Sequence, residues 1–344
     1  MSFFVSFLGF ERLLGKWAQE KPVYVLRYIQ DSLHYQRLAP GSEDGIVYDS
    51  TRAGEPLKAF FFKIKERVAQ YPSSSSEVET TWPSFIIVGA KACDLRSLEI
   101  LDGTLAKGET KDPFYLESRS KAAIVSTDCS SPEESCFCTM LGLTPYPEEG
   151  FALNLSKISE GLVVEIGSEE GEKLISQDKD VFCEASPAQL EERDRNRAAT
   201  LFKVREQNKK FTLSKSYQQI AKEKFASPAY HRYAGKCMEC AACLSVCPTC
   251  HCFLLYDQKV NENFEKVRIW DFCYYRGYAR VGGGANARPT VSDRFKNKYI
   301  NKFDFSMANF GVYACTGCGR CIEACLAGID MRQVFKDLEA SQIV

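Results

Sequence analysis

The 344-residue chain has almost no net charge and no long apolar run. Lys and Arg total 44 against 45 for Asp and Glu, so the formal net charge is −1. A chain without a basic surplus has no electrostatic footprint for nucleic acid. No stretch approaches the eighteen or so apolar residues that a membrane-spanning helix needs. The sequence therefore predicts protein partners and small redox molecules, with no nucleic acid and no direct membrane span.

The segment MSFFVSFLGFERLL at the start is the only one that suggests a secretory signal. Its apolar run is brief, lacks a basic leader and meets Glu11 and Arg12 at once. We therefore expect an N-terminal strand or an amphipathic helix here. Sixteen cysteines in so long a chain also do not fit a secreted disulfide scaffold, which is typically short. We expect a cytoplasmic protein whose thiols stay reduced.

Two copies of the pattern CxxCxxCxxxC occupy the last third of the chain. The first copy is followed by Pro248, and Leu326 follows the second where the pattern favours proline. Three cysteines spaced by two residues can reach three iron corners of a [4Fe-4S] cube from one tight loop, and the fourth usually serves the other cluster. The cysteines of the two copies are Cys237, Cys240, Cys243 and Cys247, and Cys315, Cys318, Cys321 and Cys325.

Crossed ligation is therefore the predicted arrangement of two [4Fe-4S] clusters. Structural zinc is the alternative, but zinc sites usually use two separated pairs of cysteines rather than four within eleven residues. Cluster 1 takes Cys237, Cys240, Cys243 and Cys325, and cluster 2 takes Cys315, Cys318, Cys321 and Cys247. The pattern indicates a protein that carries electrons.

The composition changes along the chain in a way that predicts three parts. Short apolar runs at 85–88, 122–125 and 162–166 read as buried strands, so residues 1–183 form an α/β (α+β) domain. Residues 71–76 form a loop by composition. Residues 184–229 read as a charged helical connector. Residues 230–344 form an α-helical, two-[4Fe-4S] ferredoxin-like domain with an inserted segment at 253–310.

Two details of the third part follow from local signals. The insert contains a glycine-rich run, 281–289, which we interpret as a turn or close-packing element because no strand and helix frame it as a dinucleotide-binding fingerprint would require. After the second motif, DMRQVFKDLEA predicts a closing helix that starts at Asp330.

Four cysteines in the N-terminal part suggest a third [4Fe-4S] cluster. Cys93 follows the strand at 85–88 and precedes a helix for which Asp94 is the expected N-cap, a position that favours a thiolate. Cys129 follows the next strand, so in a parallel sheet it emerges at the same edge. Cys136 and Cys138 lie a few residues further on. Buried or incidental thiols are the alternative interpretation.

The remaining cysteines leave the ligand partition open. Cys250, Cys252 and Cys273 are three further candidate ligands, which would need a fourth to complete a cluster. Cys183 stands alone, and we expect an ordinary packed thiol there. His251 lies between two cysteines, but position alone does not make it a ligand.

Taken together, these residues resemble the dicluster [4Fe-4S] electron-transfer subunit family, whose members include an iron–sulfur subunit of anaerobic sulfite reductases and the beta subunit of soluble sulfhydrogenases. The resemblance covers about residues 85–335, and the first 80 residues show no match. It rests on ACDLRSLEILD, the DC…CFC segment with Met140 and Gly142, CPTCHC, WDFC…GGGANARP, and CTGCGRCIEAC followed by Ala327-Gly328-Ile329-Asp330.

The resemblance implies a protein without a substrate site of its own. It would relay electrons between a flavin subunit that oxidises NAD(P)H and a separate catalytic subunit, in a hetero-oligomeric anaerobic complex of the sulfite reductase, hydrogenase or heterodisulfide reductase-linked type. The unassigned cysteines leave two other hypotheses open. One is an Fe–S redox sensor or regulatory binding subunit, and the other is an enzyme that uses an N-terminal cluster as its substrate site.

Overall fold

The computed structural model describes residues 2–72, 82–176 and 178–342, which divide into two compact units. Unit 1 comprises Met1–Leu57, Trp82–Asn208 and Thr316–Cys318. Unit 2 comprises Lys58–Thr81, Lys209–Cys315 and Gly319–Val344. Most of the loop predicted at 71–76 lies outside the described residues, and the division of the chain at residues 183 and 229 stays a prediction.

Unit 1 is built on one mixed sheet whose strand order is β3-β2-β5-β6-β7-β8-β1-β9. The neighbours β2, β5, β6 and β7 run parallel, and the other pairs are antiparallel. The strands are β1 (Ser2–Ser6), β2 (Val23–Ile29), β3 (Ser32–Arg37), β5 (Phe85–Ala90), β6 (Ala122–Thr127), β7 (Leu153–Lys157), β8 (Gly161–Ile166) and β9 (Cys183–Glu184). The three strands predicted from apolar runs are thus confirmed as β5, β6 and β8.

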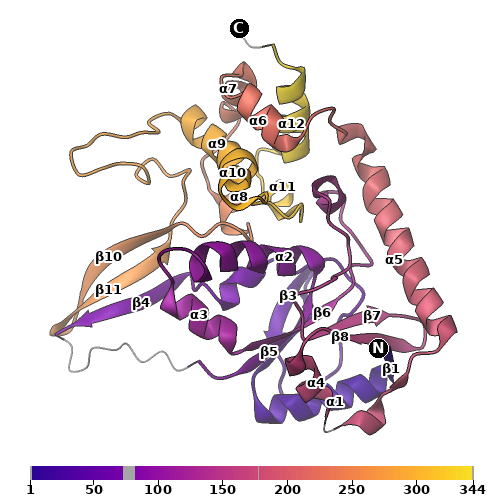
Figure 1. Ribbon diagram of the computed structural model, residues 1–344. Helices are drawn as coiled ribbons and strands as arrows, with labels where there is room; N and C mark the ends of the chain where they lie inside the picture. The colour runs from indigo at the N-terminus through magenta and orange to yellow at the C-terminus, as the bar shows by residue number, and fades with distance from the viewer. Residues whose placement is uncertain (1, 73–81, 177, 343–344) are drawn as a thin grey trace. The chain divides into compact units, whose positions relative to one another are not determined.

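Helices cover both sides of this sheet. Every residue of β5 is buried, which is the pattern of a parallel strand covered on both faces. The main apolar core joins α1 (Phe7–Glu20) and α4 (Glu169–Ser176) to the sheet. In Figure 1 these two helices lie on the opposite side from α2 (Ala92–Leu101) and α3 (Pro113–Ser120), which connect β5 to β6. The N-terminal segment therefore forms both a strand and a helix.

The start of α2 differs from the prediction. Asp94 is not the N-cap: Lys91 holds that position, and Asp94 is the third helical residue. The Asp94 carboxylate accepts a hydrogen bond from the backbone N–H of Lys91 over 3.3 Å, which is half of a capping box. The physical reason is that β5 runs on to Ala90 and leaves a single residue before the helix. Cys93 is the second helical residue, so its place at a helix N-terminus is confirmed.

The charged segment after residue 184 contains the long helix α5 (Pro187–Asn208). Only Thr200, Val204 and Asn208 of its residues are buried, so most of this helix presents charged side chains to solvent, as its sequence indicates. Cys183, predicted to be packed, is exposed on the two-residue strand β9. That prediction was wrong because β9 pairs with β1 at the end of the sheet order.

Unit 2 contains short helices around an aromatic core. The ring of Tyr217 lies 5.0 Å from that of Phe303 and 4.6 Å from that of Phe335, and Tyr299 contacts Phe335. The closing helix begins at the N-cap Asp330, as predicted. The helices are α6 (Tyr217–Glu223), α7 (Pro228–Ala234), α8 (Ala242–Ser245), α9 (Val291–Ile300), the π-helix η6 (Asn301–Phe305), α10 (Ser306–Phe310), α11 (Arg320–Glu323) and α12 (Met331–Ala340).

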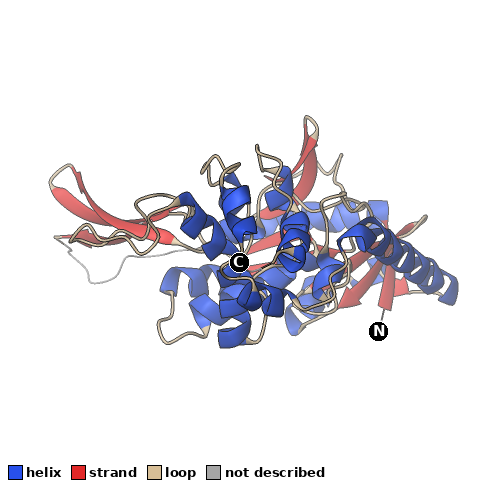
Figure 2. Ribbon diagram, turned by 90° about the horizontal axis from the view of Figure 1, so that it is seen from above, coloured by secondary structure: helices blue, strands red, loops and turns tan. Residues whose placement is uncertain are grey.

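A three-stranded antiparallel sheet completes unit 2, in the order β10-β11-β4. Its strands are β4 (Lys65–Tyr71), β10 (Phe253–Val260) and β11 (Asn263–Trp270), seen as the long red strands at the left of Figure 2. The predicted insert therefore begins with a hairpin before it becomes helical. The glycine-rich run forms a turn, because Gly284 adopts a φ of +83° and the backbone N–H of Val281 donates to the carbonyl of Ala285.

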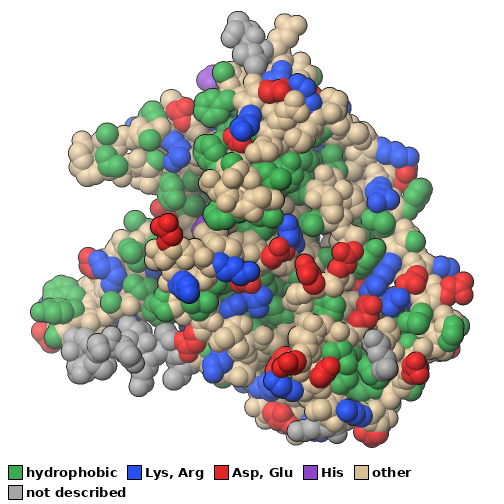
Figure 3. Space-filling view, viewed as in Figure 1, with side chains coloured by type: hydrophobic (Ala, Val, Ile, Leu, Met, Phe, Trp, Pro, Cys, Tyr) green, Lys and Arg blue, Asp and Glu red, His purple; other side chains and the backbone are tan. Residues whose placement is uncertain are grey.

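The surface agrees with the near-zero net charge. Figure 3 shows basic and acidic side chains interspersed over the visible face. In the part of the chain that the structure describes, no helix has the length and apolar character to cross a bilayer.

Candidate metal centres

The two CxxCxxC motifs share an unusual backbone pattern. In the first, Glu239 and Ala241 adopt left-handed φ values of 52° and 58°, and in the second the equivalent residues Gly317 and Gly319 adopt 63° and 78°. A left-handed residue other than glycine costs about 1–2 kcal/mol, and such strain gathers at functional sites. Each motif then enters a single helical turn, α8 or α11. The sequence repeat is therefore also a repeat of conformation.

Cys237, Cys243 and Cys325 come together in unit 2. Burial raises the pKa of the Cys237 thiol, and the nearby sulfurs of Cys243 and Cys325 raise it further. The backbone N–H of Ile329 donates to the Sγ of Cys325 over 3.3 Å. Leu326 stands where proline was expected and is 76% exposed. The leucine therefore does not disturb the contact between Ile329 and Cys325. Three of the four ligands predicted for cluster 1 are thus neighbours.

Cys247, the last cysteine of the first motif, meets the beginning of the second motif. The Nζ of Lys302 donates to the Sγ of Cys247 over 3.3 Å, to the Oγ1 of Thr249 over 2.9 Å and to the carbonyl of Ala314 over 3.0 Å. The Thr249 hydroxyl also donates to the Ala314 carbonyl over 2.8 Å. Because Ala314 precedes Cys315, one polar cluster joins the two motifs inside unit 2. Cys321 belongs to unit 2, and Cys318 belongs to unit 1.

Buried lysines face these cysteines. Burial acts to lower the pKa of Lys302, but Cys247, Cys250 and Cys315 outweigh it and the pKa is raised. Lys298 behaves in the same way beside Cys243 and Cys321, among other groups. A buried ammonium group requires a compensating negative charge or hydrogen-bond acceptors. Thiolates that hold a cluster supply such charge, so the residues present fit an anionic iron–sulfur group.

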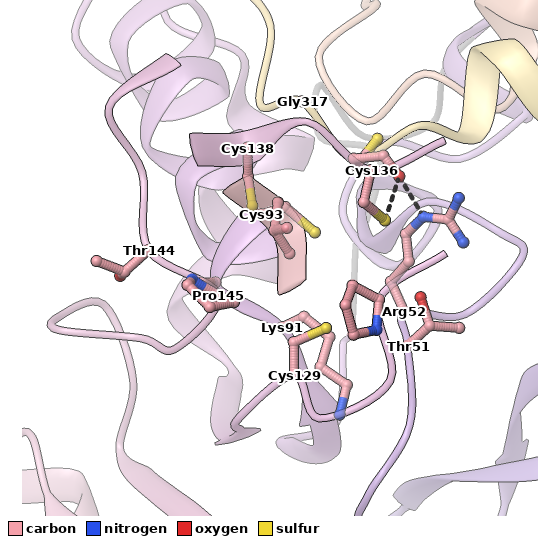
Figure 4. Close-up of a pocket in the computed structure, with 14 residues that line it drawn as sticks. Thr51, Arg52, Lys91, Cys93, Cys129, Cys136, Cys138, Thr144, Pro145 and Gly317 are labelled. Carbon is pink, nitrogen blue, oxygen red and sulfur yellow. Dashed lines mark hydrogen bonds between the residues drawn. The ribbon is translucent and has the colours of Figure 1, made fainter. Parts of the chain in front are cut away.

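Unit 1 contains a third group of thiols, which we call the cysteine hollow. It is a small cavity lined by Cys93, Cys129, Cys136 and Cys138, with Cys318 also in its wall (Figure 4). Because β5 and β6 are parallel neighbours, Cys93 and Cys129 emerge at the same edge, as predicted. Cys138 begins the turn η3 (Cys138–Leu141). The structure therefore brings together all four N-terminal candidates.

Two cations border the cysteine hollow. The Nζ of Lys91 donates to the Oγ1 of Thr127 over 2.6 Å and to the carbonyl of Asp128 over 3.1 Å. The Nε of Arg52 donates to the carbonyl of Cys318 over 2.5 Å. Both side chains are buried, and both act to lower the pKa of the Cys129 thiol, which burial nevertheless raises. They are placed to balance the charge of thiolates in the hollow.

The segment Thr316–Cys318 forms part of the same wall. The Sγ of Cys136 lies 3.7 Å from the carbonyl of Cys318, and Figure 4 shows this contact beside that of Arg52. On the other side, the amides of Gln207 and Asn208 each donate to the carbonyl of Cys136 over 2.8 Å. Burial raises the pKa of the Cys136 thiol, and a cysteine that binds a metal does so as the thiolate.

The other candidate cysteines lie close to Cys247 or to one another. Cys250 lies beside Cys247, whose pKa is lowered by a hydrogen bond from Cys250. Cys252 and Cys273 are near each other, and burial raises the pKa of Cys273 to about 11. The Nδ1 of His251 lies 3.1 Å from the carbonyl of Thr249. None of these contacts identifies a fourth ligand.

Sequence reasoning missed the polar residues that support the cysteines: Arg52, Lys58, Lys91, Thr249, Lys298 and Lys302. A lysine or arginine is normally assigned to the surface. Nearness to a cysteine in the sequence could have identified Lys91 and Thr249, but no sequence signal marks the other four. Within the described ranges, no three His, Cys, Asp or Glu side chains converge closely enough to bind a single metal ion. A [4Fe-4S] cube binds its thiolates at separate irons, and every predicted ligand is a thiol.

Comparison with known proteins assigns the chain to a family. A 4Fe-4S dicluster domain model matches residues 236–329. The chain is 33% identical over 312 residues to sulfhydrogenase 2 subunit beta of Pyrococcus furiosus. The matched region covers 88% of each protein. That coverage extends into the first 80 residues, where the sequence alone suggested no match. The chain therefore belongs to the iron–sulfur subunit family of the sulfhydrogenase beta subunits, as an electron-transfer protein with a 4Fe-4S dicluster domain.

Proposed function

We propose that this chain is the electron relay of a cytoplasmic, anaerobic oxidoreductase complex. It would pass electrons between a flavin-containing subunit that oxidises NAD(P)H and a separate catalytic redox subunit. The name of the relative, a beta subunit of a sulfhydrogenase, supports a hetero-oligomer of this kind. The catalytic partner would be of the hydrogenase, sulfite reductase or heterodisulfide reductase-linked type.

Two [4Fe-4S] clusters with crossed ligands form the centre of the proposal. The observation that carries it is the contact of Lys302 with both Cys247 and Ala314, because it joins the end of the first motif to the start of the second. Cluster 1 would take Cys237, Cys240, Cys243 and Cys325, and cluster 2 would take Cys315, Cys318, Cys321 and Cys247.

A third [4Fe-4S] cluster would be held in the cysteine hollow by Cys93, Cys129, Cys136 and Cys138. The cavity is lined by these four thiols and by Cys318, with two buried cations at its border, and the four N-terminal thiols support this assignment. The wall segment Thr316–Cys318 includes Cys318, a predicted ligand of cluster 2.

The residues of this chain hold and tune their cofactors rather than act on a substrate. When bound, [4Fe-4S] clusters supply one-electron redox chemistry. The backbone N–H of Ile329 and the ammonium group of Lys302 donate to sulfur, and such donors together with burial set reduction potentials. A relay needs no general acid, general base or nucleophile.

Anaerobic purification tests the proposal. We expect about twelve irons per chain and as many sulfides, three cubes by the ligand count, with EPR signals after dithionite reduction. A measured content of about eight irons per chain, two cubes by the ligand count, would exclude the third cluster. Zinc in place of iron would overturn the electron-transfer assignment. The isolated chain should show no turnover, so that sulfite reduction or hydrogen oxidation by it would contradict a pure relay.

A further inference from the structure

We propose that Lys302 is a positioning residue that joins the two cysteine motifs and raises the reduction potential of the cluster that Cys247 binds. This inference rests on the proposed function, because it takes Cys247 and Cys315 as ligands of one cluster.

Lys302 is held in place both at its backbone and at its ammonium group. It lies in the π-helix η6, between the buried residues Ile300 and Phe303 of the unit 2 core. Its backbone carbonyl accepts a hydrogen bond of 2.9 Å from the N–H of Ala314, and its ammonium group donates to the carbonyl of the same residue. π-Helical turns are rare and occur frequently at functional sites. The side chain is therefore fixed against the residue that precedes Cys315.

The ammonium group has a full set of acceptors, and one of them is a sulfur. Its three N–H groups are matched by the Cys247 sulfur, the Thr249 hydroxyl and the Ala314 carbonyl. The Thr249 hydroxyl lies 3.3 Å from the same sulfur. No carboxylate forms an ion pair with Lys302 among the described residues, so its charge is not neutralised by an acidic side chain. The charge acts on the thiolate and on what it binds.

A fixed positive charge favours the reduced state of a nearby redox group. Reduction by one electron adds one negative charge, and a buried cation is weakly screened by solvent and salt. Lys302 is only 6% exposed. Lys58 is buried as well, but its ammonium donates to the Cys250 carbonyl and lies 4.1 Å from the centre of the Trp270 ring, so Lys302 differs from it in donating to a cysteine sulfur.

The test is an EPR redox titration of the anaerobically purified full chain and its Lys302→Met and Lys302→Arg variants. We expect Lys302→Met to make reduction of one cluster at least tenfold less favourable, which is 59 mV for one electron, while Lys302→Arg recovers most of this change. Lys296→Met is the matched control, because Lys296 lies on α9 with its ammonium over the Phe225 ring. Equal potentials in Lys302→Met and the wild type would overturn the inference.

A second measurement does not depend on the stability of the variant. Pulsed EPR of the reduced wild-type chain, with lysine labelled with ¹⁵N at Nζ, should show a nitrogen coupled to one cluster, and Lys302→Arg should remove that coupling. A wild-type spectrum without the coupling would overturn the inference even if Lys302→Met fails to load iron. Failure of the proposed function is distinguishable, because the wild type would then lack the irons of the dicluster domain altogether.

Discussion

The backbone N–H of Phe137 donates a hydrogen bond of 2.8 Å to the carbonyl of Gly317. This bond lies within unit 1, although Gly317 belongs to the second cysteine motif near the end of the chain. A Cβ atom on Gly317 would lie 2.5 Å from the backbone nitrogen of Cys138. The motif therefore closes against the loop that carries Cys136 and Cys138, and only glycine fits at that point.

Substitution of Gly317 by alanine should disrupt the cysteine hollow. The left-handed φ of 63° costs an alanine about 1–2 kcal/mol, and the contact with the Cys138 backbone adds to this. We expect a loss of about 2–4 kcal/mol and of about four irons per chain, the content of one cube. Iron analysis and the apparent unfolding temperature measure this. Gly282→Ala is the control, because a Cβ atom there meets nothing within 4 Å; equal effects of the two substitutions would contradict the prediction.

Sequence patterns predicted the parts of the fold that depend on local or periodic signals. The buried strands β5, β6 and β8 are apolar over most of their length, and the Asp330 cap is a local signal. Cys93 and Cys129 were placed at one sheet edge by a general rule for parallel strands. The two cysteine motifs were evident because their spacing is dictated by the cube.

The sequence did not predict what depends on distant contacts. Strand β4 pairs with β11, almost two hundred residues later, and its charged start, Lys65-Glu66-Arg67, gives no sign of this partner. The burial of Lys302 and Lys91 follows from sulfur and carbonyl acceptors brought by other segments. Cys183 looked like a core thiol because cysteine is usually buried, but the order of strands leaves it exposed.

Replacement of Cys129 by serine should remove the third centre and spare the other two. We expect iron to fall by about four per chain, with the EPR signals of the dicluster domain unchanged, because Cys129 lies in the cysteine hollow of unit 1. Cys183→Ser is the matched control, since Cys183 is exposed and lies outside the hollow. Unchanged iron in Cys129→Ser would show that the hollow holds packed thiols.

Crossed ligation predicts which pairs of alanine substitutions damage the same cluster. Cys247→Ala and Cys315→Ala should damage the same cluster and leave one residual EPR spectrum. Cys237→Ala and Cys325→Ala should damage the other cluster and leave a different one. The physical reasons are two. Cys237 and Cys325 are neighbours, and Lys302 contacts both Cys247 and Ala314, the residue before Cys315. Matching spectra for Cys237→Ala and Cys247→Ala would instead indicate that each motif binds its own cluster.

Removal of Arg197 should destabilise the base of the cysteine hollow. Its Nε donates to the Oδ2 of Asp128 over 2.7 Å, and its guanidinium also pairs with Glu165 and lies 4.8 Å from the Tyr146 ring centre. Arg197→Met would leave Asp128, which directly precedes Cys129, without its cation, whereas Glu165 would keep its ion pair with Arg193. Breaking a buried ion pair from one side is costly, and since Asp128 is 13% and Glu165 28% exposed we expect a loss of about 2–3 kcal/mol.

The matched control for this substitution lies on the same helix. Arg195 pairs with Glu191 over 3.3 Å, and their side chains are 65% and 72% exposed, so Arg195→Met should change stability by less than about 0.5 kcal/mol. Apparent unfolding temperatures at one heating rate, measured without oxygen, compare the two variants. At about 2–4 °C per kcal/mol for a domain of this size, Arg197→Met should unfold about 4–12 °C lower. If both variants unfold at the same temperature, Arg197 contributes no more to stability than an exposed residue, and Cys129 is held by the sheet alone.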